Sequence, residues 1–313
     1  MFPELGETRK KVVRQATGLF TFDRSLFGGL VLGSIYEIYG YTHVGKSTLS
    51  YFLSGTVRPA GKIMLADFEH FDPVYVESCL RMSGFDGTVY QPRYDYGEQT
   101  LEDLRDALLD TEFQAGILDS VGTLVTKAEL EGELTDANMG LKARRIAPWM
   151  RQMLYVLKRT DACLFIVNHL HQIMTLGNAS TTHGGVAIHN SAHVRLRLSV
   201  EKQDDEYIIV NGRLDKNRYG GKGKKGRPFK FVIVPNVGIH LGLSAVQDCN
   251  WLGLLEESPR IRLDGTDYGY FKNLAGRVQK GEDVDLEPFK EKLRAGTDDG
   301  PNDTRDSSDN KTS

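Results

Sequence analysis

The stretch "GYTHVGKST", residues 40–48, fits the spacing G-x-x-x-x-G-K-[ST] of a phosphate-binding loop. Gly40 and Gly45 are expected to let the backbone take positive φ and curl its N–H groups around phosphate oxygens. Lys46 is placed to meet the β and γ phosphates, and the hydroxyl of Ser47 is placed to bind Mg²⁺. The spacing predicts a nucleoside triphosphate and magnesium as ligands, and the alternative is a glycine turn that binds no nucleotide.

The residues on either side of this loop favour the nucleotide interpretation. "IYEIYG" (35–40) has the pattern of a short apolar strand, and "KSTLSYFLSG" (46–55) that of the start of an amphipathic helix. A helix that begins at the end of the loop directs its N-terminus, with its unpaired N–H groups, at a bound anion. The predicted order is therefore strand, phosphate loop, helix.

Length and composition indicate a soluble globular protein. The 313 residues suffice for one large core and a smaller appended domain, and 40% are hydrophobic and 26% charged. No apolar run reaches the roughly 20 residues of a membrane helix, and "MFPELGETRKK" lacks the apolar core of a signal peptide. The three cysteines are far apart and lack C-x-x-C spacing, which argues against a disulfide framework and a zinc site. We expect a protein of the reducing cytoplasm.

The net charge of −3 is unevenly distributed. Residues 296–313 contain five Asp against one Arg and one Lys, a net of −3, so residues 1–295 sum to about zero. This composition predicts a disordered acidic tail. Residues 142–159 contain six Lys or Arg and no acid, and residues 213–230 contain eight and one Asp. One such stretch is usually a solvated surface, but two in a nucleotide-binding protein favour a polyanionic partner.

Strand and helix patterns alternate after the phosphate loop. Alternation of buried apolar strands with helices predicts a mostly parallel sheet flanked by helices on both faces. Later strands follow one another through short links and are expected to extend the sheet in antiparallel fashion. The predicted strands are 62–67, 115–120, 163–168, 193–202, 206–216 and 230–241, and the predicted helices 100–111 and 148–159. A helix (244–257), a hairpin (260–271) and a helix (286–295) are expected to form a small α+β C-terminal domain.

Polar side chains follow three of these strands, at the edge where parallel sheets bind ligands. Glu69 follows one strand and suits a base that orients an attacking water, Asp119 ends another and suits a magnesium carboxylate, and His169 follows a third. Any one of the carboxylates could instead be a helix cap. Convergence of three strand ends on one phosphate loop favours a catalytic site.

Four stretches resemble the RecA family, the strand-exchange recombinases of bacteria and their phage relatives. They are "TGLFTFDRSLFGGLVLGSIYEIYG" (17–40), "DFEHFDPVY" (67–75), "ILDSVGTLVTKAELEGELTDANMGLKARR" (117–145) and "GNASTTHGG" (177–185). The likeness runs in unbroken order over roughly residues 17–240, and "AELEGELTDANMGLKAR" is far more specific than a phosphate loop alone. The resemblance implies a RecA-like P-loop ATPase core that uses ATP and Mg²⁺ and forms helical filaments on single-stranded DNA. Its further implied partners are duplex DNA, mediator proteins and single-strand-binding proteins.

The resemblance also implies roles at the nucleotide. Asp72 and Tyr75 would contact the adenine, although the link before Asp72 is one residue shorter than in the family. Lys216 and Arg218 would reach the γ phosphate bound to a neighbouring protomer, where the family usually has two lysines. The implied catalytic residues are Lys46, Glu69, Asp119 and His169. The implied cofactor and metal ligands are Gly40, Gly45, Lys46, Ser47, Thr48, Asp72, Tyr75, Asp119, Lys216 and Arg218.

Two DNA loops are implied at about residues 132–140 and 170–185, the second shorter than in the family. The DNA-binding positions that match the family are Met139, Arg144, Arg151, Gly184 and Gly185. Glycine amides approach phosphates closely, arginines neutralise them, and methionine can enter between stacked bases. The alternatives are ordinary loop packing for the methionine and a glycine turn without ligand. "KGKKGR" (222–227) would either hold the incoming duplex or solvate a hairpin tip.

Three departures from the family pattern carry expectations of their own. Residues 1–16 form a shorter N-terminal arm than in bacterial RecA, so filament contacts would differ. Pro148 is expected to interrupt the helix after the first DNA loop and to start a new one. His169 stands where bacterial RecA has Gln. T4-type phage recombinases resemble this chain in having His there, which favours a phage origin and therefore a location in the host cytoplasm. The expected divisions are the arm, an ATPase core (17–243), a C-terminal domain (244–295) and the tail (296–313).

The leading functional prediction is an ATP-dependent recombinase that pairs and exchanges DNA strands in recombination and repair. A ring-forming helicase or repair ATPase on the same core would be expected to carry a further domain. A RecA-like accessory ATPase would bind nucleotide, DNA or partners without strand exchange. The shortened arm and second loop leave that alternative open, whereas intact Lys46, Glu69 and Asp119 argue against it.

Overall fold

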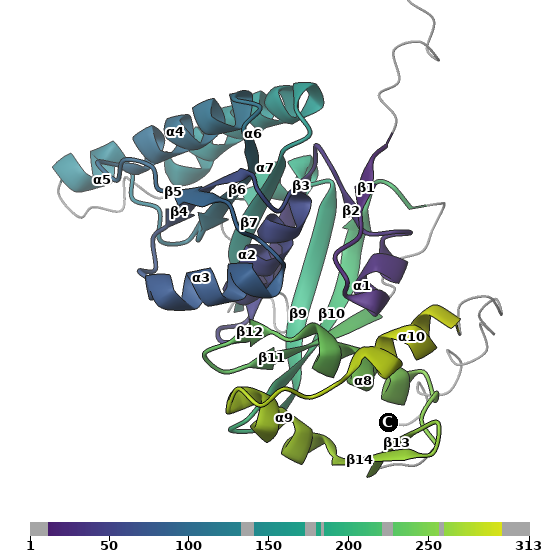
Figure 1. Cartoon of the computed structure of the whole chain (residues 1–313). Helices are drawn as coiled ribbons and strands as arrows, with labels where there is room; N and C mark the ends of the chain where they lie inside the picture. The colour runs from purple at the N-terminus through teal and green to yellow at the C-terminus, as the bar shows by residue number, and fades with distance from the viewer. Residues whose placement is uncertain are drawn as a thin grey trace, which may run out of the picture.

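Strand β3 (Ile35–Gly40) lies near the middle of the large sheet of the computed structural model (Figure 1). The structure describes residues 12–132, 141–172, 180–182, 185–220, 228–256 and 260–295. Within these residues the sheet has ten strands, in the order β12-β11-β10-β9-β3-β7-β6-β4-β5, with β8 paired to β7. The bounds of the other nine are β4 (Lys62–Asp67), β5 (Thr88–Tyr90), β6 (Phe113–Asp119), β7 (Cys163–Gln172), β8 (Ser180–Thr182), β9 (Val194–Gln203), β10 (Ile208–Asn217), β11 (Pro228–Val234) and β12 (Gly238–Ile239).

The predicted sheet is confirmed. Strand β3 pairs in parallel with both β7 and β9, and β6 and β4 continue the parallel half. Strands β10 to β12 pair in antiparallel fashion and extend the sheet on the other side. Because parallel strands end at the same edge, the residues after β3, β4, β6 and β7 come together there.

Helices cover both faces of the sheet, as Figure 1 shows, because successive side chains of each strand point to opposite faces. In β7, Phe165 packs into the core under α2 (Lys46–Val57) and α3 (Pro73–Met82). Its neighbours Leu164 and Ile166 pack into the core under the other helices. Those helices are α4 (Gly97–Leu109), α6 (Leu141–Arg159) and α7 (Gly185–Ser191), and the short α5 (Lys127–Glu131) precedes α6.

The expected break at Pro148 is wrong, since α6 runs through it without interruption. A proline inside a helix removes one hydrogen bond of the i to i−4 ladder. Trp149, Met150 and Met153 are buried in the next turn, and the Trp149 indole donates to the Leu101 carbonyl at 2.7 Å. Ile146, two residues before Pro148, lies in the same core, so buried contacts flank the proline on both sides.

The remaining elements lie at the two ends of the described chain. The N-terminal ones are β1 (Arg14–Gln15), α1 (Phe20–Ser25) and β2 (Leu30–Val31), and the C-terminal ones are α8 (Leu241–Trp251), β13 (Arg260–Leu263), β14 (Thr266–Tyr270), α9 (Phe271–Gln279) and α10 (Glu287–Ala295). The predicted hairpin and two of these helices are present, whereas α9 was not predicted. Leu243 and Phe289 share a core with Val232 of β11. The division of 244–295 as a domain of its own stays a prediction. None of the helices in the described ranges is long and apolar enough to cross a membrane.

Asp248 of α8 is a buried carboxylate that joins this region to α1. Its Oδ1 accepts a hydrogen bond from the Thr21 hydroxyl at 3.0 Å, and its Oδ2 accepts one from the Thr21 N–H at 3.3 Å. Burial raises the pKa of Asp248 to about 7, against the opposing effect of the Thr21 bonds. The folded state therefore binds this proton more tightly than the unfolded state.

We predict that Asp248→Asn flattens the dependence of stability on pH. A raised carboxyl pKa makes the free energy of unfolding of the native chain fall as pH rises from about 4 to 7. The amide mimics the protonated acid, so the variant should match the parent near pH 4 and exceed it at pH 8 by roughly 2–4 kcal/mol. Denaturant unfolding across this range measures the difference, with the exposed Asp86→Asn as control. Parallel curves for parent and Asp248→Asn would contradict the prediction.

Candidate nucleotide-binding and catalytic site

The phosphate loop connects the end of β3 to the start of α2, as its sequence predicts. Gly45 has φ of +80°, and a Cβ there would lie 2.4 Å from Ile233 Cδ1. A Cβ on Gly40 would lie 2.6 Å from the carbonyl oxygen of Leu198. Gly45 therefore requires glycine for its positive φ, whereas Gly40 does not have the expected positive φ and requires glycine for space beside the Leu198 backbone.

Lys46 begins α2 and is 5% exposed. Its Nζ donates to the Tyr41 carbonyl at 2.7 Å. Burial lowers the pKa of Lys46, and the nearby carboxylates of Asp119 and Glu69 oppose that effect. The ammonium is thus held by a neutral loop carbonyl, and a phosphate oxygen would be a stronger acceptor for it.

Asp119 ends β6 and is completely buried. Neither of its carboxylate oxygens has a hydrogen bond of ordinary geometry among the described residues. Burial raises the pKa of Asp119 to about 7, while the adjacent Ser47 hydroxyl lowers it. Oxygen ligands suit Mg²⁺, and a buried carboxylate with both oxygens unsatisfied requires a partner. Asp119 and Ser47 therefore fit a magnesium ion or the water bound to it.

Glu69 lies just beyond β4 and is held from two sides. Its Oε1 accepts from the Ser120 hydroxyl at 2.8 Å and lies 3.0 Å from His169 Nε2. Burial raises the pKa of Glu69, but the bonds to His169 and Ser120 outweigh it and bring the pKa below its ordinary value. An ionised carboxylate accepts only, so Nε2 of His169 carries the proton. Glu69 is therefore a charged acceptor in a fixed position at the edge of the sheet.

The residues expected near the adenine start α3. Asp72 caps that helix, and its carboxylate accepts from the Val74 N–H at 3.0 Å. The Tyr75 hydroxyl lies 2.9 Å from the hydroxyl of Thr48, which places Tyr75 against the end of the phosphate loop. Burial raises the pKa of Tyr75, so the phenol stays protonated. Adenine contact stays a prediction for both residues.

Lys216 and Arg218 do not lie with this group. Lys216 Nζ donates to the carbonyls of His189 at 2.7 Å and Asn190 at 2.9 Å, and Arg218 donates to that of Asn190 at 2.6 Å. Burial lowers the pKa of Lys216, and the charges of Arg218 and Arg195 act in the same direction. Within one chain these cations cap the C-terminal end of α7.

Three of the residues expected at DNA lie on α6 and α7. Arg144 and Arg151 are both exposed and are seven residues apart on α6, which places them on one side of the helix. Gly185 is the first residue of α7. Met139 and Gly184 lie outside the described residues, as do most of the two expected DNA loops. The DNA-binding roles stay predictions.

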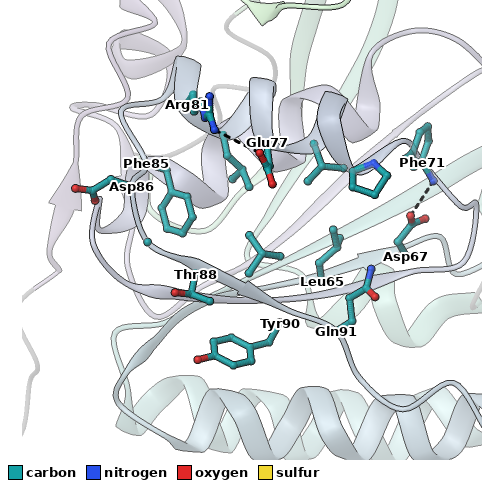
Figure 2. Close-up of a pocket in the computed structure, with 15 residues that line it drawn as sticks. Leu65, Asp67, Phe71, Glu77, Arg81, Phe85, Asp86, Thr88, Tyr90 and Gln91 are labelled. Carbon is teal, nitrogen blue, oxygen red and sulfur yellow. Dashed lines mark hydrogen bonds and ion pairs between the residues drawn. The ribbon is translucent and has the colours of Figure 1, made fainter.

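A cavity of about 930 Å³ runs between α3 and the strands β4 and β5. Figure 2 shows its lining, with Leu65 and Phe85 among the apolar side chains, and the bond from the Phe71 N–H to Asp67 at one end. None of the predicted catalytic residues lines it. The cavity is therefore separate from the phosphate loop.

Three residues of the site were missed from the sequence. Ser120 donates to Glu69, Asn168 accepts from the His169 N–H at 3.0 Å, and Glu37 accepts from the Asn168 amide at 3.0 Å. The signal for Ser120 was a hydroxyl directly after Asp119, and the signal for Glu37 was one charge inside the apolar strand "IYEIYG". The signal for Asn168 was an amide at the end of the predicted strand 163–168, directly before His169.

We predict that Ser120→Ala lowers kcat for nucleotide hydrolysis about three- to tenfold and leaves KM within about twofold. The hydroxyl orients Glu69 but does not lie in the phosphate loop, so substrate binding should be spared. Steady-state hydrolysis measures both constants. Ser54→Ala is the matched control, because this buried hydroxyl donates within α2 itself, to the Tyr51 carbonyl. A raised KM with unchanged kcat would show that Ser120 acts on binding instead.

Comparison with known proteins places the chain in a family. The family model described as "RecA N-terminal domain" matches residues 2–235. The chain is 33% identical over 273 residues to Protein RecA of Thermosynechococcus vestitus, covering 84% of this chain and 73% of that protein. It is 36% identical over 250 residues to Protein RecA of Cytophaga hutchinsonii, covering 76% and 68%. With Protein RecA of Gloeobacter violaceus it shares 34% identity over 283 residues, covering 87% and 73%. The chain therefore belongs to the RecA family.

Proposed function

We propose that the chain is a DNA-dependent ATPase that polymerises on single-stranded DNA and promotes homologous pairing and strand exchange in recombination and repair. The observation that carries this proposal is the convergence of Lys46, Asp119 and Glu69 at one edge of the sheet. They supply a desolvated ammonium, a buried carboxylate with unsatisfied oxygens, and an ionised carboxylate held by two hydrogen bonds. Membership of the RecA family supports the same assignment.

The roles within one site follow from these environments. Lys46 and the loop amides would bind the β and γ phosphates of ATP, and Ser47 and Asp119 would hold Mg²⁺. The metal would neutralise charge on the phosphate oxygens. Glu69 would orient the attacking water and accept its proton, because its lowered pKa keeps it ionised at neutral pH. His169 and Ser120 hold Glu69 in position.

Two features support assembly and coupling to DNA. β7 carries His169 beside Glu69 and ends at Gln172, within the expected second DNA loop of about residues 170–185. We propose that ATP binding at Glu69 and His169 changes the conformation of this loop, so that the bound nucleotide controls the affinity for DNA. Lys216 and Arg218 would leave the α7 carbonyls for the γ phosphate of a neighbouring protomer, since a phosphate is the stronger acceptor.

The finer assignments also belong to the proposal. We propose a phage-type member of the family, because His169 follows Asn168 as in T4-type phage recombinases. It would act in the host cytoplasm with duplex DNA, mediator proteins and single-strand-binding proteins as further partners. Two basic stretches, 142–159 and 213–230, support the DNA partners.

We predict that Glu69→Gln binds ATP but hydrolyses it at least a hundredfold more slowly, since the amide keeps the shape and loses the proton acceptor. It should therefore form persistent helical filaments on single-stranded DNA with ATP itself. Electron microscopy compares it with the parent protein, which should form filaments with a slowly hydrolysed ATP analogue. Closed rings would favour a helicase, and filaments without strand exchange would favour an accessory ATPase. Fast ATP hydrolysis by Glu69→Gln would show that another residue acts as the base for the attacking water.

We predict that Arg144→Ala and Arg151→Ala weaken single-stranded DNA binding uniformly across sequences. Each lost phosphate contact should lower the slope of log affinity against log salt by about 0.7. Fluorescence anisotropy at several salt concentrations measures the slope. Arg81→Ala, which removes an exposed arginine of α3, is the matched control and should leave it unchanged. An unchanged slope in both α6 variants would show that these arginines are ordinary solvated surface residues that do not contact DNA.

A further inference from the structure

Glu37 is a completely buried carboxylate in the middle of β3. Strand β9 places Arg195 directly beside it in register, and the Arg195 Nε donates to Oε2 at 2.5 Å. On the other side, β7 carries Asn168, whose Nδ2 donates to Oε1 at 3.0 Å. Both neighbours of the carboxylate are therefore hydrogen-bond donors.

This arrangement decides which way the Asn168 amide points. A carboxylate paired with a guanidinium accepts hydrogen bonds and donates none, so the NH₂ group of Asn168 must face Glu37. The amide oxygen of Asn168 then faces the other way and accepts a hydrogen bond from the backbone N–H of His169 at 3.0 Å. The His169 ring in turn lies 3.0 Å from Glu69 through Nε2. Three hydrogen bonds thus connect the buried strand to the proposed catalytic carboxylate.

We propose that Glu37 is a positioning residue for hydrolysis, which fixes the amide orientation of Asn168 and thereby holds His169 against Glu69. The inference rests on the proposed ATPase function for its consequence, but the orientation itself is a property of the folded chain. Glu37 lies in the strand before the phosphate loop and is fully buried, so it acts through Asn168 and His169.

The substitution Glu37→Gln tests whether position 37 needs a side chain that accepts hydrogen bonds and donates none. The new amide has one oxygen and one NH₂ group, whereas both Arg195 and Asn168 donate. If the oxygen faces Arg195, two NH₂ groups meet at Asn168. Rotation of the Asn168 amide relieves that clash but turns its NH₂ group toward the His169 N–H. Either outcome breaks one of the three hydrogen bonds that connect residue 37 to Glu69.

A second change should repair this defect. In the double variant Glu37→Gln/Asn168→Asp, the new amide at position 37 can accept from Arg195 and donate to the new carboxylate at position 168. The second oxygen of that carboxylate can accept from the His169 N–H. The total charge is that of the parent protein. The single variant Asn168→Asp instead sets two carboxylates against each other and should be impaired as well.

The experiment measures DNA-dependent ATP hydrolysis and amide hydrogen exchange at His169 for the parent, both single variants and the double variant. We expect each single variant to lose about tenfold in kcat with KM within about twofold, and the double variant to recover to within about threefold of the parent. Protection of the His169 amide should fall and recover in the same pattern. Asp248→Asn is the matched control, a substituted buried carboxylate on α8 that should leave kcat within twofold.

The outcomes separate positioning from stability and from the proposed function. Thermal melting of all variants identifies any loss that follows unfolding. If Glu37→Gln does not fold, activity of a folded double variant near that of the parent supports the proposal, and an inactive folded double variant overturns it. Additive losses in the double variant, or exchange at His169 that ignores both substitutions, also overturn it. A parent protein without ATPase activity would count against the proposed function, while the exchange pattern would still decide the role of Glu37.

Discussion

The buried ion pair between Glu37 and Arg195 is the interaction on which the middle of the sheet depends. Burying a carboxylate costs several kcal/mol unless donors replace the water that it loses. Here the donors come from both neighbouring strands, Arg195 on β9 and Asn168 on β7. A shift of either strand by one residue would remove its donor from this carboxylate, so the ion pair disfavours other registers as well as holding the observed one.

The same register brings the functional groups to one edge with different electrostatic surroundings. Asp119 is completely buried without hydrogen bonds of ordinary geometry in the described part of the chain, and burial raises its pKa to about 7. Glu69 is partly exposed and held by Ser120 and His169, which bring its pKa below the ordinary value. Under the proposed function, the two carboxylates, with pKa values moved apart, would serve two tasks, Asp119 at the metal and Glu69 at the attacking water. The neighbouring ammonium of Lys46 tends to keep both ionised.

The C-terminal end of α7 is bonded to residues at the end of β10, in the antiparallel half of the sheet. Lys216 lies near the end of β10, and Arg218 directly follows that strand. Both donate to carbonyls at the C-terminal end of α7, while α7 itself packs against β3 and α6. A cation that bonds to neutral carbonyls in one chain can exchange them for a charged phosphate in a neighbouring one. Under the proposed function, filament assembly would therefore act on α7, close to the strand that carries Glu37.

The sequence by itself determined the order of elements, the strand–loop–helix phosphate site and the strand ends where polar residues collect, because periodicity and glycine spacing are local properties. It failed at Pro148, where packing of Trp149 and its neighbours outweighs one lost hydrogen bond, and it missed α9. Only the tertiary structure decided that Ser120 bonds to Glu69 and that Glu37 orients Asn168. Those contacts join residues that are far apart in the chain, and their partners depend on strand order and register, which no local pattern encodes.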